Sequence, residues 1–155
     1  MRRKSQKGLT LVELIVAITI LSILSVLAMP LARMRIRIER ERDLRDAIQQ
    51  LHTAIDKYKD NCDANYFGPP KLGSDCYPES LEILVQGMTL AQDPNGTKLK
   101  FLRSIPRDPF TGKFEWGLRS TADDPKSESW GGQNVFDVYS KTQEKAPDGT
   151  PYAEW

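Results

Sequence analysis

The feature that most constrains this chain is an uncharged stretch near its start. Leu14 to Ala32 is a run of 19 residues without Asp, Glu, Lys or Arg. A helix needs about 17–25 predominantly apolar residues to cross the hydrocarbon core of a bilayer, which is about 30 Å thick. The stretch therefore predicts one membrane-spanning helix. A chain of 155 residues then leaves room for one soluble domain of modest size.

A basic leader precedes this stretch. Residues 1–8 carry four positive charges and no negative one, in a chain whose net charge is only +1. The positive-inside tendency places the leader in the cytoplasm and the C-terminal part across the membrane. The apolar run is too long for a secretory signal peptide, and its small residue, Gly8, lies before it rather than after it. The near-neutral charge favours no nucleic-acid partner.

Glu13 is the one charged residue near the beginning of the apolar run. A charge in a bilayer segment costs about 2.5–3.5 kcal/mol on insertion scales and usually has a function or a partner. In a stack of identical helices, this carboxylate can pair with the N-terminal amine of a neighbour. It can also reach the headgroups from the helix end without a partner. Both explanations remain open at this point.

The sequence KGLTLVEL at residues 7–14 resembles the prepilin peptidase site of type IV pilins and type II secretion pseudopilins. The resemblance implies cleavage after Gly8 and methylation of the new N-terminus at Leu9, where the family usually has Phe. It also implies assembly roles for Glu13, which becomes the fifth mature residue, and for Pro30 at the family's helix proline position.

The same resemblance divides the chain into three parts. These are a cleaved leader (1–8), a transmembrane and assembly helix (9–32), and a periplasmic head that includes the second half of the long helix (33–155). It implies a single-pass protein of the bacterial inner membrane with a cytoplasmic N-terminus, later part of a periplasmic filament. The implied partners are copies of the chain in a helical homo-oligomer, prepilin peptidase, the inner-membrane assembly platform and minor pseudopilins.

Residues 33–60 have a helical pattern that is no longer lipophilic. Apolar residues recur at steps of four and three and form one stripe, made of Leu44, Ile48, Leu51, Ile55 and Tyr58. We expect one helix over residues 9–60 with a kink or local unwinding at Pro30. The single histidine, His52, lies on this helix and is interpreted as a packing or surface residue.

Cys62 and Cys76 are the only cysteines of the chain. An exported domain can form disulfides, and two cysteines allow a single pairing. We therefore predict a Cys62–Cys76 bridge. One distant histidine does not complete a zinc site with them.

The remaining residues predict an α+β head. A short helix is expected over residues 77–86, stopped by Gly87, because proline and acid lie at its first turn. Strands are expected near residues 99–105, 113–118 and 134–139. The predicted fold is a long N-terminal helix, transmembrane in its first half, packed on a small antiparallel sheet.

Several motifs of the head resemble the major pseudopilin of type II secretion and imply a pilin-like fold. These are Tyr77-Pro78, the IPRDPF sequence at 105–110, and the DVYS sequence at 137–140. The resemblance implies a structural subunit of a pseudopilus that drives protein export. Paired cysteines are more typical of pilins, so a type IV pilin subunit serving adhesion, motility or DNA uptake is the alternative. A membrane-tethered binding module that does not assemble is a third hypothesis.

The resemblance also implies calcium in the loop after the last strand. The oxygen ligands available there are Ser140, Thr142, Glu144 and Asp148, beside two lysines that weaken the prediction. The alternative is a metal-free loop held by Pro147, Pro151 and Trp155. No enzyme is expected, because the sequence offers no Ser/His/Asp or Cys/His set around its one histidine.

Overall fold

The structure is a computed structural model that describes residues 10–155, apart from the side chains of residues 27–32. Its contacts divide the chain between Glu39 and Arg40 into two compact units. The first unit contains the N-terminal part of the long helix, and the second contains the rest of that helix and the whole head.

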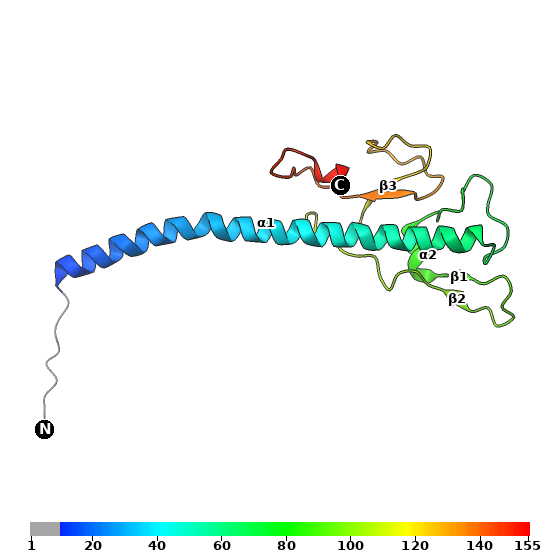
Figure 1. Cartoon of the computed structure of the whole chain (residues 1–155), viewed down its shortest axis with the longest axis horizontal. Coiled ribbons are helices and arrows are strands. Elements are labelled where there is room, and N and C mark those ends of the chain that lie inside the picture. Colours follow the sequence, from blue (N-terminus) through cyan, green and yellow to red (C-terminus); the bar gives the residue numbers. More distant parts are fainter. Residues whose placement is uncertain (1–9) are drawn as a thin grey trace, which may run out of the picture. The chain divides into compact units, whose positions relative to one another are not determined.

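The elements confirm the predicted α+β class, with two small antiparallel sheets instead of one (Figure 1). Strand β1 pairs with β2, and β3 pairs with β4. Within the second unit, α2 and the β1–β2 hairpin lie on one side of α1, and the β3–β4 sheet lies on the other. In chain order the elements are α1 (Leu11–Asp63), α2 (Leu81–Gln86), β1 (Met88–Thr89), β2 (Lys98–Leu99), β3 (Gly117–Arg119), β4 (Asp137–Tyr139) and the 3₁₀ turn η1 (Tyr152–Glu154).

Helix α1 begins after Thr10, whose side-chain oxygen accepts a hydrogen bond from the backbone N–H of Glu13 at 3.3 Å. A threonine that accepts from the third helical residue is a typical N-cap. The helix ends at Asp63, three residues beyond the predicted end. Its backbone is helical on both sides of Pro30 and at that position. The side chain of Pro30 lies outside the described residues, and the kink stays a prediction.

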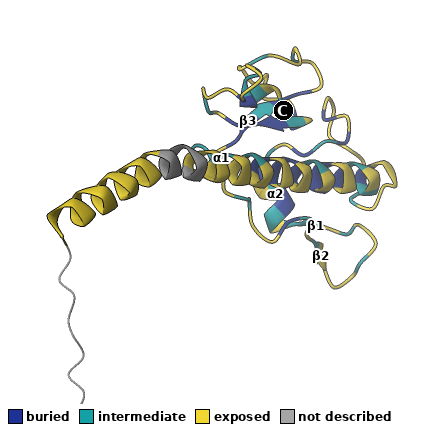
Figure 2. Cartoon of the chain, turned by 60° about the vertical axis from the view of Figure 1, so that its left-hand side comes forward, coloured by how far each residue is buried: buried dark blue, intermediate teal, exposed yellow. Residues whose placement is uncertain are grey.

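The core of the head forms on the predicted stripe of α1. All five stripe residues are buried, and Ala47 and Ala54 fill the positions between them (Figure 2). Leu84 of α2, Val135 and Val138 close this core with no exposed surface. Fully burying one such side chain contributes about 1.5–3 kcal/mol, so the stripe holds the head on the second half of α1.

The predicted strands are longer than the observed ones because other partners take their backbone groups. After β2, the N–H groups of Phe101 and Leu102 both donate to the carbonyl of Leu84 in α2. Before β4, the N–H of Val135 donates to the carbonyl of Pro78. The backbone N–H groups of these residues bond to α2 and to the segment just before it instead of to a neighbouring strand. Strands β2 and β4 are therefore short. Strand β1, directly after Gly87, was not predicted.

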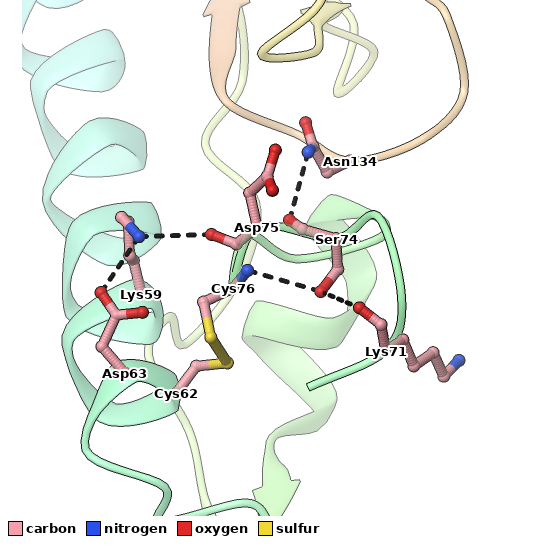
Figure 3. The surroundings of a disulfide bond; sticks show 8 residues. All are labelled: Lys59, Cys62, Asp63, Lys71, Ser74, Asp75, Cys76 and Asn134. Atoms are coloured by element: carbon pink, nitrogen blue, oxygen red, sulfur yellow. Dashed lines mark hydrogen bonds and ion pairs between the residues drawn. A yellow bond between two sulfur atoms is a disulfide. The ribbon is translucent and has the colours of Figure 1, made fainter. Parts of the chain in front are cut away.

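The predicted Cys62–Cys76 disulfide is present (Figure 3), with 5.5 Å between the two Cα atoms. Cys62 lies in the last turn of α1, and the bridge closes the loop that follows it. Lys59 supports the same loop, since its ammonium group donates to the carbonyl of Asp75 at 3.2 Å and to the Asp63 carboxylate at 3.0 Å. The bridge and the lysine thus hold the two ends of the loop together.

Replacing Cys62 by serine is expected to lower the free energy of unfolding by about 3 kcal/mol, because a loop of about 15 residues regains its freedom in the unfolded chain. Thermal unfolding of the full chain in detergent measures this loss. The Cys62→Ser and Cys76→Ser variants and the double variant should unfold at the same temperature. A double variant that is much less stable than either single one would contradict a role exerted through the bridge alone.

Candidate functional site

The first described turns of α1 expose a continuous apolar surface. From Leu11 to Val26 every residue is exposed in the single chain, and Leu11 has 76% of its surface accessible. Three hydroxyl groups in this segment are satisfied by the helix itself, since Thr19, Ser22 and Ser25 each donate to the carbonyl four residues earlier at 2.7–2.8 Å. A helix that satisfies its own polar groups suits an apolar environment.

In the part of the chain that the structure describes, no helix combines the length and the apolar character required of a membrane span. Glu13 lies exposed in the first turn of α1. Gly8 and Leu9, the predicted cleavage and methylation residues, lie outside the described residues, as does the side chain of Pro30. The roles of these four residues therefore remain predictions.

A polar cluster of the head lies across β3 and β4. Arg119 and Asp137 are directly opposed in the register, and Arg119 Nη1 donates to Asp137 Oδ2 at 2.9 Å. The other carboxylate oxygen of Asp137 lies 2.8 Å from Nε2 of His52 on α1. His52 is half-buried on α1, which agrees with its interpretation as a packing or surface residue, but no sequence pattern indicated its partner Asp137.

An aromatic ring covers the same face of the sheet. Gly117 is opposed to Tyr139, and a β-carbon at Gly117 would collide with the tyrosine ring. Since residues two apart on a strand share a face, the guanidinium of Arg119 reaches this ring and stacks 4.1 Å from its centroid. Glycine at position 117 thus makes room for the ring that supports Arg119.

These contacts set the charge state of Asp137. Burial raises the pKa of its carboxyl, but the hydrogen bonds from His52 and Arg119 outweigh burial, and the net pKa lies below the ordinary value of 3.8. A carboxyl with a lowered pKa stabilises the folded protein fully above its unfolded pKa, and this stabilisation is lost as the pH falls through the folded pKa.

We therefore expect this contribution to be constant above about pH 5 and to decline below about pH 4. The measurement is the midpoint of urea unfolding at several pH values for the wild type and for Asp137→Asn. The variant should be less stable at neutral pH, and its stability should change less between pH 5 and pH 3. If the stability of the wild type and of Asp137→Asn declined equally between pH 5 and pH 3, groups other than Asp137 would cause the sensitivity to acid.

The turn at residues 107–112 is joined to the end of β4 by a buried carboxylate. Asp108 has no exposed surface. Its Oδ1 accepts from the backbone N–H groups of Phe110 at 2.8 Å and Thr111 at 3.3 Å, and its Oδ2 accepts from the Ser140 hydroxyl at 2.7 Å. Asp108 is therefore a positioning residue for the loop that begins at Ser140.

Three of the four side chains of the predicted calcium site, those of Ser140, Thr142 and Asp148, are engaged in local hydrogen bonds, and Glu144 takes part through its backbone N–H. The Ser140 hydroxyl donates to Asp108 and accepts from the N–H of Thr142, while Thr142 Oγ1 accepts from the N–H of Glu144. Asp148 Oδ1 accepts from the N–H of Thr150 in a separate turn. Within residues 10–155, no three His, Cys, Asp or Glu side chains gather as a metal site. This arrangement does not fit the six to eight oxygens that calcium takes.

The C-terminal turn η1 is held on α1 by side-chain contacts. The Tyr152 hydroxyl donates to a carboxylate oxygen of Glu41 at 2.6 Å, and the Arg45 guanidinium lies 4.2 Å from the centroid of the Trp155 ring. Tyr152 is fully buried and packs on Phe110. The metal-free alternative of the sequence analysis named Trp155 as one of the residues that hold the loop, but no sequence pattern indicated Glu41 and Arg45 as partners of this turn.

Comparison with known proteins supports the resemblance found in the sequence. Residues 3–29 match the family of the prokaryotic N-terminal methylation motif. The chain is 29% identical to the type II secretion system core protein G of Pseudomonas aeruginosa over 144 aligned residues. The alignment covers 90% of this chain and 85% of that protein.

A second relative carries the same name in Klebsiella michiganensis. It is 29% identical over 120 residues, covering 74% of this chain and 75% of the relative. No solved structure matches the chain. The matched motif lies in the N-terminal segment and the matched length extends through the head. The chain thus matches the N-terminal methylation motif and is similar over most of its length to core protein G of type II secretion systems.

Proposed function

We propose that this chain is the structural subunit of a periplasmic pseudopilus that drives protein export in a type II secretion system. The observation that carries the proposal is the similarity over most of the chain to core protein G, together with the methylation motif at residues 3–29. The described contacts serve architecture: they join strands, loops and the C-terminal turn to α1. The function of such a subunit is mechanical, because it consists of packing against other copies of the chain in a filament.

The exposed apolar segment of α1 supplies the surface for this stacking. Large apolar side chains that are exposed all around a helix need a lipid or protein environment. In the proposal, residues 9–32 first lie in the inner membrane with the leader in the cytoplasm, and prepilin peptidase then cuts after Gly8. Copies of the mature chain leave the membrane through the assembly platform and pack by these helices below minor pseudopilins.

Both relatives reported above are secretion proteins, which favours this function over that of a type IV pilin. Deleting the gene separates the two. The proposal expects the loss of secretion of exoproteins with adhesion, motility and DNA uptake unchanged. A pilin predicts the reverse pattern.

Fibres sheared from cells that overproduce the chain test assembly itself. They should contain it as the principal component, with a methylated Leu9 at the N-terminus by mass spectrometry. The control is Gly8→Glu, which places a charged side chain at the cleavage site and should leave uncleaved precursor and no fibres. Fibres built from chains that retain Met1 would contradict the processing step, and the absence of wild-type fibres would favour a tethered module.

A further inference from the structure

Arg119 is a cation enclosed by oxygen atoms from three separate segments of the head. Its side chain is only 6% exposed. Nη1 donates to Asp137 Oδ2 at 2.9 Å, Nε to the carbonyl of Ser127 at 2.9 Å, and Nη2 to the carbonyl of Ala153 at 3.0 Å. The Tyr139 ring closes one face of the guanidinium.

Through these three bonds, Arg119 ties together three separate segments of the head. Ser127 lies in the long loop between β3 and β4, Asp137 lies in β4, and Ala153 lies in η1 near the C-terminus. Because a guanidinium presents its donors in a rigid fork, one side chain fixes the spacing of all three segments. Losing it leaves a half-buried carboxylate and two carbonyls without these donors.

One carboxylate and two backbone carbonyls are also the kind of oxygen ligands that a calcium ion takes. Here both oxygens of the Asp137 carboxylate are engaged, one by Arg119 and the other by His52. The hydroxyl of Ser140, the first residue after β4, is directed to Asp108. Both carboxylate oxygens of Asp137 are thus directed to donors of the protein itself, and the Ser140 hydroxyl donates to the Asp108 carboxylate.

We propose that Arg119 acts as the internal cation of this head, and that it fixes the loops after β3 and β4 without calcium. The guanidinium performs the cross-linking that a metal ion in the last loop would perform. The C-terminal half of the head therefore folds, and keeps η1 on α1, at any free calcium concentration.

The wild-type protein gives the first test. The full chain in detergent is unfolded by heat in 1 mM calcium chloride and in EGTA, and near-ultraviolet circular dichroism follows tertiary structure. We expect the two midpoints to agree within about 2 °C. A structural site with a dissociation constant of about 10 µM would raise the midpoint by about 10 °C. A rise of 5 °C or more in calcium would overturn the proposal.

The second test removes the cation and keeps its volume. Arg119→Met should lower the midpoint by about 10–20 °C, because it leaves Asp137 and the carbonyls of Ser127 and Ala153 without the donors of the guanidinium. The matched control is Arg103→Met, which removes the same charge from an exposed position and should shift the midpoint by less than about 2 °C. Equal midpoints for the two variants would overturn the proposal.

Digestion by carboxypeptidase reports on η1 directly, since Arg119 holds the carbonyl of Ala153. At 25 °C the last three residues should be released at least tenfold faster from Arg119→Met than from Arg103→Met, as measured by mass spectrometry. An unchanged rate in a folded Arg119→Met protein would show that η1 does not depend on the guanidinium. If Arg119→Met does not fold at all, the wild-type comparison in calcium and EGTA still decides.

Discussion

Fibres are expected to be absent, or at least tenfold fewer, when Glu13 is replaced by alanine. The carboxylate of Glu13 lies exposed in the first turn of α1, within the apolar segment proposed to pack against neighbouring subunits. In the proposed filament we expect it to meet the positively charged amine of Leu9 from another copy. Two unit charges 4 Å apart attract by about 4 kcal/mol at an effective dielectric constant of 20, although desolvation opposes this attraction.

A net loss of only about 1.4 kcal/mol for each contact lowers the association constant tenfold. Glu13→Ala also makes the segment more lipophilic, so insertion into the membrane should be unaffected. Glu13→Gln keeps the shape and removes the charge, and we expect it to be nearly as defective. The backbone N–H of Glu13 still donates to Thr10 in both variants, because that bond does not use the side chain.

The assay is electron microscopy of fibres at matched subunit levels, with membrane insertion and processing at Leu9 checked in the same cells. A defect in insertion or processing would place the role of Glu13 before assembly. Normal fibres from both variants would mean that the carboxylate only reaches towards the headgroups, and the proposed registration by charge would be wrong.

Replacing Asp108 by alanine is expected to destabilise the head by about 3 kcal/mol, which lowers the melting midpoint by more than about 10 °C. The Asp108 carboxylate is fully buried and accepts two backbone N–H groups and the Ser140 hydroxyl. Alanine leaves the buried Ser140 hydroxyl and the two partly buried N–H groups without this acceptor. Asp108→Asn keeps one acceptor oxygen for the turn, and its amide can donate to Ser140, so the loss should be about 1 kcal/mol.

Asp124 offers the matched control for this prediction. It is exposed in another turn, where its Oδ1 accepts from the backbone N–H of Lys126 at 2.9 Å. Asp124→Ala removes the same kind of turn bond without burial and should cost less than about 1 kcal/mol. The measurement is thermal or urea unfolding of the three variants in detergent. Equal losses for Asp108→Ala and Asp124→Ala would show that burial and Ser140 add nothing.

The sequence determined those parts of this protein that depend on local patterns. The spacing of Leu44, Ile48 and Leu51 predicted the buried stripe of α1, because a helix places residues three and four apart on one face. Two cysteines allowed one pairing, which the structure contains. The leader and the apolar run indicated the prepilin class, which the matched motif supports.

Only the tertiary structure decided which polar residues of the head act together. His52, Arg119 and Asp137 come from a helix and two strands that are far apart in sequence, and no local period relates them. The strands ended early for the same reason, since the backbone groups of Phe101 and Val135 found partners in and beside α2. The calcium ligands were chosen by residue type, and only the structure places the Ser140 hydroxyl on Asp108 and Asp148 in a separate turn. Such competition between distant partners depends on the packed positions of whole segments, and a linear pattern contains no information on those positions.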